Sequence, residues 1–264
     1  MFIEIREGIF GAYRLPLFEK NKLLFNNILE VAGRNHRAFA ITENLDEIQN
    51  IQTIGIISSQ GRLWLISNET DFGKFEKFAQ LMPASFICCP THSEILHKNL
   101  SKTGQILSKS DTVLSYGYIM KKEKEFVKYN ICGGGLRHAR KSDFPIIESM
   151  LEGFFAETYG TEAAMAARTS SKHKYYVWED KGVIRSISAI TCIGCGIARV
   201  NYVYTLPQHR CRGYGHMLVW VLSNEILRHG LIPALNVSSK NRKAATMYEA
   251  IGYEFYGELD IYSV

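Results

Sequence analysis

The sequence predicts a mixed α/β chain (α+β, with a mixed sheet) of two domains, and two patterns support this prediction. Short runs rich in Val, Ile and Tyr, which favour strands, alternate with segments whose apolar residues recur at helical spacing. The charged run Lys121–Lys128 and the triplet Gly133-Gly134-Gly135 interrupt this alternation, and such a composition is typical of a linker. We therefore expect a smaller N-terminal α/β domain over residues 1–128 and a second domain over residues 135–264.

Turn and breaker residues bound the elements of the first domain. Gln60-Gly61 between two apolar runs predicts a hairpin, and Pro90, which has no backbone N–H, ends the preceding strand. The expected elements are helices over Leu17–Gly33, Phe72–Leu81 and Ser93–Asn99, and strands over Thr53–Ser58, Arg62–Ser67, Ser85–Cys89 and Val113–Lys121.

In the second domain, three strands in hairpin order precede a helix, a strand, a helix and a final strand. Turns are expected at Asp180-Lys181-Gly182 and Cys192–Gly196, and Asp143 and Asn241 are the expected N-caps of the helices that follow them. The expected strands are Leu136–Ala139, Lys174–Glu179, Val183–Cys192, Ile197–Thr205, Pro233–Val237 and Tyr253–Tyr262. The expected helices run from Asp143 to Ala156, Glu162 to Thr169, Gly215 to Arg228 and Arg242 to Ala250.

The overall charge does not indicate a nucleic-acid-binding protein. The chain has 264 residues, 31 basic and 26 acidic, with a net charge of +5. Its composition, 46% hydrophobic and 22% charged, is that of an ordinary soluble globular protein. The charge is nevertheless uneven, because Glu225 is the one acidic residue between Lys181 and Tyr248 against nine basic ones. This asymmetry favours an anionic partner, although a solvated basic face remains the alternative.

The cysteines and the N-terminus indicate a cytoplasmic protein without a metal site. Cys192 and Cys195 have CxxC spacing, but the sequence has no second pair and no suitable histidine cluster to complete a zinc site. Glu4, Arg6 and Glu7 interrupt any apolar run after Met1, and no segment is long and apolar enough to span a bilayer. We therefore expect reduced thiols, no metal, no membrane partner and a cytoplasmic location.

The segment Pro207–Gly215, which reads Pro-Gln-His-Arg-Cys-Arg-Gly-Tyr-Gly, lies between an apolar strand and an apolar helix. The helix start has no Ser, Thr, Asp or Asn at a plausible N-cap and no carboxylate in its first turn. Arg210 and Arg212 lie there instead, and cations at the positive end of a helix dipole cost about 0.3–1 kcal/mol each. We infer that a phosphate or diphosphate from outside the chain supplies the missing negative charge, an ordinary strand-to-helix turn being the alternative.

Two segments of the second half resemble signatures of the GNAT superfamily of acyl-CoA N-acyltransferases. Val203–Gly215, with Arg210, Gly213 and Gly215, resembles the Arg/Gln-x-x-Gly-x-Gly/Ala signature, and Asn241–Tyr253 resembles Asn-x-x-Ala-x-x-x-Tyr-x-x-x-Gly-Phe/Tyr. The resemblance covers about residues 135–264. The first half is similar to the degenerate leading domain of two-domain relatives such as the glycine N-acyltransferase-like group, and it has no second copy of the loop.

The resemblance implies a C-terminal GNAT fold with a splayed central mixed sheet and a site for acetyl-CoA (or coenzyme A) as co-substrate. Backbone N–H groups of the loop would bind the diphosphate, backbone groups of Val203 and Thr205 would pair with the pantetheine, and Tyr248 would protonate the departing thiolate. Asn241 would contact the cofactor as well as cap its helix, and Ala244 would leave room for the thiol end. The implied cofactor-binding residues are Val203, Tyr204, Thr205, Arg210, Cys211, Arg212, Gly213, Tyr214, Gly215, His216, Asn236, Asn241 and Ala244.

Several alternatives stay open at this point. Tyr248 could be a core tyrosine with a satisfied hydroxyl, and Val203 and Thr205 could belong to a complete sheet ladder. Ile197–Thr205 contains no carboxylate to act as a general base, so four residues remain candidates for that role. They are Glu157, His173, Glu179 and Asp180. The aromatic residues of Phe154–Tyr159 and Tyr175–Trp178 fit an acceptor pocket and core packing equally well.

The predicted function is N-acetyl transfer from acetyl-CoA to a primary amine of a small molecule or peptide by direct attack in a ternary complex, without nucleic-acid or membrane partners. A homodimer is left open. The alternative is a non-catalytic acyl-CoA-binding sensor. Dinucleotide binding is less favoured, because Gly213-x-Gly215 follows antiparallel hairpin strands and not a βαβ unit.

Overall fold

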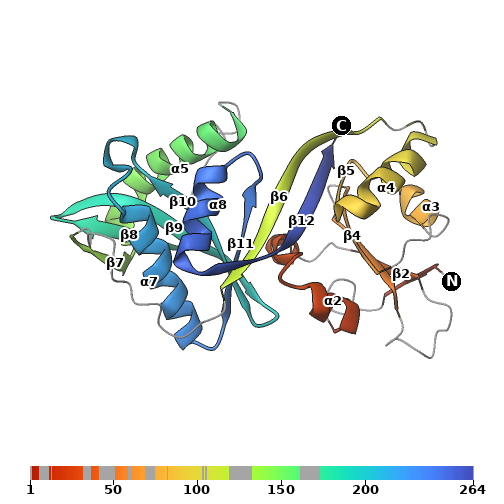
Figure 1. Cartoon of the computed structure of the whole chain (residues 1–264), viewed down its shortest axis with the longest axis horizontal. Helices are drawn as coiled ribbons and strands as arrows, with labels where there is room; N and C mark the ends of the chain where they lie inside the picture. The colour runs from red at the N-terminus through yellow and green to blue at the C-terminus, as the bar shows by residue number, and fades with distance from the viewer. Residues whose placement is uncertain are drawn as a thin grey trace. The chain divides into compact units, whose positions relative to one another are not determined.

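The computed structural model of the chain describes residues 2–5, 12, 14–31, 37–41, 51–58, 61–68, 75–81, 83–102, 104, 106–118, 133–160 and 173–263 (Figure 1). These residues form two compact units. Unit 1 comprises Met1–Tyr116, Asn236–Ala245 and Phe255–Val264, and unit 2 comprises Gly117–Leu235 and Thr246–Glu254. The C-terminal part of the chain therefore contributes to both units.

Unit 1 contains a mixed sheet whose strands follow the order β1-β2-β3-β4-β5-β12-β6. The first four strands pair antiparallel, and β4 pairs with β5 in parallel. Its elements are β1 (Phe2–Glu4), α2 (Pro16–Asn21), the 3₁₀ helix η1 (Asn26–Val31), β2 (Arg37–Ile41), β3 (Thr53–Ile57), β4 (Arg62–Ser67), α3 (Glu76–Ala79), β5 (Ser85–Cys88), α4 (Pro90–Lys102) and β6 (Ser108–Tyr118).

The last strand of the chain, β12 (Tyr253–Ser263), completes the sheet of unit 1. Its residues Asp260–Ser263 pair antiparallel with Ser85–Cys88 of β5. The Tyr262 ring stacks on the Phe86 ring, with centroids 4.6 Å apart. The two ends of the sequence thus share one sheet.

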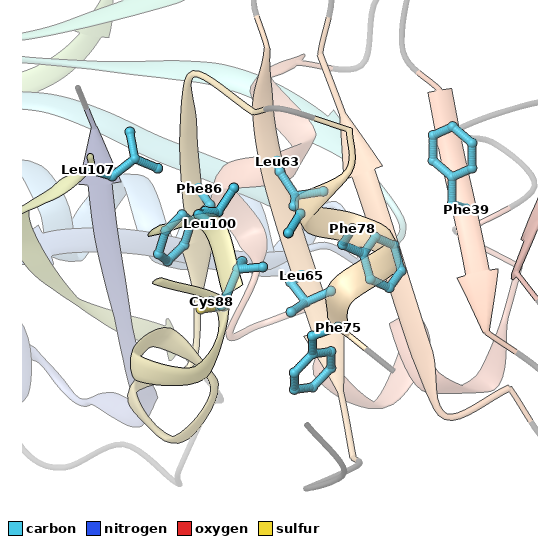
Figure 2. Close-up of a cluster of buried hydrophobic side chains, with 11 residues drawn as sticks. Phe39, Leu63, Leu65, Phe75, Phe78, Phe86, Cys88, Leu100 and Leu107 are labelled. Atoms are coloured by element: carbon cyan, nitrogen blue, oxygen red, sulfur yellow. The ribbon is translucent and has the colours of Figure 1, made fainter. Parts of the chain in front are cut away.

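Large apolar side chains from β4, β5 and α4 form the core of unit 1 (Figure 2). Leu63 and Leu65 alternate along β4, and Phe78 of α3 closes the cluster against the sheet. A side chain at Gly55 of β3 would lie 2.1 Å from the Phe78 ring, so the missing Cβ makes room for that ring. This close packing fixes α3 on the sheet.

Unit 2 repeats the succession of pairings found in unit 1. Three antiparallel pairs, β7-β8, β8-β9 and β9-β10, are followed by the parallel pair β10-β11. The elements are β7 (Gly135–His138), the 3₁₀ helix η4 (Lys141–Asp143), α5 (Phe144–Tyr159), β8 (Lys174–Asp180), β9 (Val183–Gly194), β10 (Ile197–Thr205), the 3₁₀ helix η5 (Pro207–His209), α7 (Tyr214–Arg228), β11 (Ile232–Ser238) and α8 (Arg242–Ile251). Strands β6, β11 and β12 and helix α8 have residues in both units.

Helices α5 and α7 cover opposite faces of the unit 2 sheet (Figure 1). Tyr175 and Val177 of β8 pack in the same cluster as α5, whereas Tyr176 between them packs in the cluster of α7. Because successive side chains of a strand point to opposite faces, this alternation assigns one helix to each face. The mixed α/β fold with a mixed sheet is therefore confirmed.

Some local predictions need correction. Residues 17–31 form two short helices, α2 and η1, where the sequence predicted one long helix. The amides of Asn21 and Asn26 donate to the carbonyls of Leu17 and Leu23, at 2.8 Å each, and such local bonds compete with a continuous helix. The α3 helix is shorter than expected, and residues 72–74 lie outside the described part of the chain, as do Glu162–Thr169 and Lys121–Lys128.

Two further residues differ from their expected roles. Asp143 makes no side-chain capping bond to α5. Its carboxylate accepts hydrogen bonds from the Arg140 N–H and from Arg137 instead, both at 2.6 Å. Two glycines of the triplet are packed. A Cβ at Gly134 would lie 2.1 Å from the Glu179 carbonyl oxygen, and the Trp178 indole donates to the Gly133 carbonyl at 3.0 Å.

Candidate functional site

The end of β10 extends beyond its parallel partner. Pairing with β11 joins Ile197–Arg199 to Ile232–Ala234, so residues 200–205 run past it. On the other side β10 pairs with β9, with irregularities after Arg199 and after Asn201. Tyr202 at the second irregularity has a φ of 52°, a left-handed conformation that is unfavourable for a bulky residue. The splayed strand expected from the sequence is therefore present, and it favours an open edge over the complete ladder.

Helix α7 begins at Tyr214, after η5 and the loop that follow this strand, and it has no acidic cap. Its N-cap is Gly213, with a φ of 83°, and there is neither a side-chain capping bond nor an acidic residue in the first turn. The Met217 N–H bonds the Gly213 carbonyl at 2.9 Å. The N–H groups of Tyr214, Gly215 and His216 precede this first helical bond and lie at the positive end of the helix dipole.

Glycine is required at two positions of the loop for different reasons. Gly213 is in the left-handed region, which glycine adopts at little cost. A Cβ at Gly215 would lie 2.9 Å from Oγ1 of Thr205. The hydroxyls of Thr205 and Ser186 share a hydrogen bond of 2.7 Å, which limits how far Thr205 can turn away. The loop therefore lies against the end of β10 with no room for a side chain at residue 215.

Arginine side chains surround the loop, but Arg210 is engaged. Its guanidinium donates to Oε1 of Glu157 at 2.7 Å and to the Thr205 carbonyl at 3.0 Å. Arg185 donates to Nε2 of His209 at 2.8 Å. Burial and the neighbouring Arg185 and Arg212 guanidinium groups lower the pKa of His209, so this imidazole is neutral and can accept that bond. Two of the three arginines beside the loop thus lie near carboxylates, Arg210 at 2.7 Å from Glu157 and Arg185 at 3.9 Å from Asp180.

The nine basic residues counted in the sequence do not form one surface. Arg199 on β10 is only 7% exposed, and burial lowers its pKa to about 10. Arg228 pairs with Glu225 at 3.0 Å. The cationic character that concerns the loop comes from Arg185, Arg210 and Arg212.

Tyr248 lies on α8 with 7% of its surface exposed. Its ring packs edge-on against Tyr253, with centroids 5.8 Å apart. Burial raises the pKa of the Tyr248 hydroxyl, and within the described ranges no residue forms a hydrogen bond with it. By contrast, the Tyr253 hydroxyl bonds that of Ser223 at 2.7 Å. The Tyr253 hydroxyl therefore has a hydrogen-bond partner that the Tyr248 hydroxyl lacks among the described residues.

Three of the predicted cofactor residues lie in unit 1. The Asn241 side chain accepts the Ala244 N–H at 3.2 Å, as an N-cap does. The Asn236 amide donates to the Ser115 hydroxyl at 2.7 Å. Ala244 lies one turn before Tyr248 on α8. The other ten predicted cofactor residues, Val203, Tyr204, Thr205 and Arg210 to His216, lie in unit 2 with Tyr248.

Among the four candidate bases, Glu157 is the one that contacts both β10 and the loop. Its Oε1 accepts the Tyr204 hydroxyl at 2.9 Å and Arg210 at 2.7 Å. Of the other three, Glu179 accepts a bond from Arg137 at 2.8 Å, Asp180 accepts the Tyr214 hydroxyl at 2.9 Å and His173 bonds the Tyr175 hydroxyl at 3.4 Å. Sequence reasoning could not choose among the four, because Glu157 lies 53 residues before Arg210.

Comparisons with known proteins concern the sequence of this region and the fold of the chain. A family model described as FR47-like protein matches residues 189–260, which include β10, the loop and α7. A search of curated proteins found no match. In the described part of the chain there is no helix long and apolar enough to cross a membrane, and no group of three or more His, Cys, Asp or Glu side chains arranged to hold a metal ion.

Several solved structures have a similar fold. A GCN5-related N-acetyltransferase from Kribbella flavida has a TM-score of 0.60 at 13% identity, with 94% of this chain and 95% of that chain covered. Another, from Sphaerobacter thermophilus, has a TM-score of 0.60 at 11% identity, with 99% and 94% covered. A tandem GNAT protein from the clavulanic acid biosynthesis pathway has a TM-score of 0.53 at 10% identity, with 99% and 98% covered. The chain therefore has the fold of these GNAT proteins over nearly its whole length.

Proposed function

We propose that the chain is a GNAT-type N-acetyltransferase that moves an acetyl group from acetyl-CoA to a primary amine of a small molecule or peptide. The junction of β10 with α7 carries this proposal. There, β10 extends beyond its parallel partner β11 and leads to the start of α7. This helix start has glycines and arginines but no acidic cap. Fold alone does not establish activity, so the proposal rests on this junction.

The residues at the junction fit the diphosphate of coenzyme A. The N–H groups of Tyr214, Gly215 and His216 lie at the positive end of the α7 dipole, where an anion is stabilised. Arg212 adds a positive charge. The absence of a Cβ at Gly215 lets the loop pack against the end of β10, beside the proposed pantetheine contacts. When bound, acetyl-CoA would supply the acetyl group as a thioester, with its pantetheine beside the backbone of Val203 and Thr205.

Tyr248 is the proposed donor to the departing sulfur. Because burial raises its pKa, the hydroxyl is fully protonated at neutral pH. The same shift makes it a weaker acid than an ordinary tyrosine, so it acts by donating a hydrogen bond and passing its proton only as negative charge develops on sulfur. Asn236, Asn241 and Ala244 are kept as proposed cofactor contacts.

Unit 1 is proposed to bind no coenzyme A, although it repeats the strand pairings of unit 2. The segment that follows β4, residues 68–75, corresponds in order to the loop after β10. Its sequence, Asn-Glu-Thr-Asp-Phe-Gly-Lys-Phe, has no arginine and no Arg-x-x-Gly-x-Gly pattern. This supports the division into a degenerate leading domain and a catalytic domain, and the free thiols of Cys88, Cys192 and Cys211 support a cytoplasmic location.

The test combines binding and turnover. Calorimetry with coenzyme A should show one site per chain, and a free-thiol assay with acetyl-CoA should show thiol release with at least one member of a panel of amino acids, polyamines, aminoglycosides and peptides. Absence of coenzyme A binding would overturn the proposal. Binding without thiol release to any amine would favour the non-catalytic sensor.

Tyr248→Phe separates catalysis from binding. We expect kcat to fall about 10²-fold, the lower end of what general acid–base groups contribute, with the Kd for coenzyme A little changed. Tyr256→Phe is the matched control, because Tyr256 is 38% exposed on β12. An unchanged kcat in Tyr248→Phe would remove this residue from the mechanism.

A further inference from the structure

The carboxylate of Glu157 holds Arg210 at the edge of the proposed diphosphate site. Oε1 of Glu157 accepts both the Arg210 guanidinium, at 2.7 Å, and the Tyr204 hydroxyl, at 2.9 Å. Gly153 makes this contact feasible, because a Cβ there would lie 2.5 Å from the Tyr204 hydroxyl. Gly153 and Glu157 are four residues apart and share one face of α5. The sequence of α5 therefore brings a carboxylate to the loop.

This ion pair is easily exchanged. The side chains of Glu157 and Arg210 are 49% and 41% exposed, and ion pairs between such exposed groups are weak. A diphosphate carries more than one negative charge and accepts arginine bonds in a forked geometry. Arg210 is two residues before Arg212 at the start of the loop, so a diphosphate bound there competes directly with Glu157 for its guanidinium.

Aromatic rings gather on the same part of unit 2. Phe154, three residues before Glu157 on α5, packs edge-on against Tyr202 at 5.6 Å and Tyr159 at 6.4 Å. His173 lies 5.7 Å from the Tyr202 ring, and Tyr159 is 67% exposed. Aromatic faces attract cations. A carboxylate close to such rings is the chemistry that binds an ammonium group.

We propose that Glu157 exchanges its cation: it holds Arg210 in the free protein and the ammonium group of the acceptor once acyl-CoA has drawn Arg210 to its diphosphate. This rests on the proposed function, which supplies both ligands. The exchange makes acyl-CoA the first substrate to bind, because the acceptor site is occupied by Arg210 until then. Because only a neutral amine can attack the thioester, the bound ammonium passes one proton to the Glu157 carboxylate before acetyl transfer, and the departing sulfur takes its proton from Tyr248.

The first test uses coenzyme A alone. Calorimetry is run on the wild type, Glu157→Gln, Arg210→Gln and the double variant, with Glu152→Gln on the exposed side of α5 as the matched control. Removing the competing carboxylate should tighten coenzyme A binding about two- to fivefold, the size expected from a weak ion pair. Arg210→Gln should weaken binding about tenfold. The Glu157 effect should vanish in the Arg210→Gln background, since no guanidinium is then held back.

Equal or weaker binding in Glu157→Gln, or the same gain in both backgrounds, would overturn the exchange. The second test uses the amine that the wild type acetylates. Glu157→Gln should raise the KM for this amine at least about tenfold. The KM of Glu157→Asp should lie between those of the wild type and Glu157→Gln. An unchanged KM in Glu157→Gln would overturn the proposal that Glu157 binds the ammonium group of the acceptor. A wild type that binds no coenzyme A or acetylates no amine refutes the proposed function itself, so the two failures are distinguishable.

Discussion

Asp260 anchors the C-terminal strand in unit 1, and Asp260→Ala should destabilise that unit strongly. The carboxylate is 2% exposed and lies on β12. It accepts the Ser93 hydroxyl of α4 at 2.9 Å, the Thr112 hydroxyl of β6 at 2.8 Å and the Lys109 ammonium at 2.7 Å. One side chain of β12 thus connects this strand to two elements, α4 and β6, that lie far earlier in the sequence.

The loss of stability in Asp260→Ala depends on how well each former partner of the carboxylate is compensated. Lys109 is 46% exposed and can be rehydrated at little cost. Ser93 is buried but also donates to the Pro90 carbonyl at 2.9 Å, so it is partly compensated. Thr112 loses its carboxylate acceptor. With about 1.5–3 kcal/mol for a hydrogen bond to a charged group, the free energy of unfolding of unit 1 should fall by about 3 kcal/mol.

Hydrogen exchange measured by mass spectrometry checks this locally. Peptides that cover β5 and β12 should exchange about 10²-fold faster in Asp260→Ala, since about 1.4 kcal/mol corresponds to tenfold. Asp260→Asn, which keeps the shape and loses the charge, should have roughly half the effect in free energy. Glu258→Ala, exposed on the same strand, is the control. Unchanged exchange in Asp260→Ala, or an equal loss in Glu258→Ala, would refute the anchoring role.

Three other outcomes are expected. Although burial tends to raise the pKa of Asp260, its bonds with Lys109, Thr112 and Ser93 lower that pKa overall. The stabilisation by Asp260 is therefore complete above the unfolded carboxyl pKa of about 3.9 and is lost as pH falls through the lower folded value. Urea unfolding at pH about 2 should no longer separate Asp260→Ala from wild type. Gly213→Val should cost about 1–2 kcal/mol, because a β-branched residue would be forced to a φ of 83°; the thermal midpoint should drop about 2–8 °C, and an unchanged midpoint would mean that the loop relaxes. Residues 1–128 expressed alone lack β12 and should aggregate. Fusing residues 253–264 to them through a flexible linker should restore a folded unit. A folded monomer without β12 would contradict the pairing of β12 with β5.

The sequence predicted most elements of unit 2 because their signals are local. Lys181 and Gly182 have φ values of 51° and 74°, as the hairpin turn between β8 and β9 requires. Gly213 and Gly230 mark the ends of α7, and Asn241 caps α8. The uncapped helix start beside arginines was also visible in the sequence, and the roles of the predicted site residues remain proposals.

The sequence alone determined the mixed α/β class, the order of strands and helices in unit 2 and the glycine-arginine loop, because turn residues, caps and apolar periodicity act over a few residues. Only the tertiary structure decided that β12 completes the sheet of unit 1 and that Glu157 holds Arg210. Both contacts join residues far apart in the chain, 172 positions apart for Asp260 and Cys88. Strand pairing and ion pairing have no fixed sequence spacing, so folding alone brings these partners together.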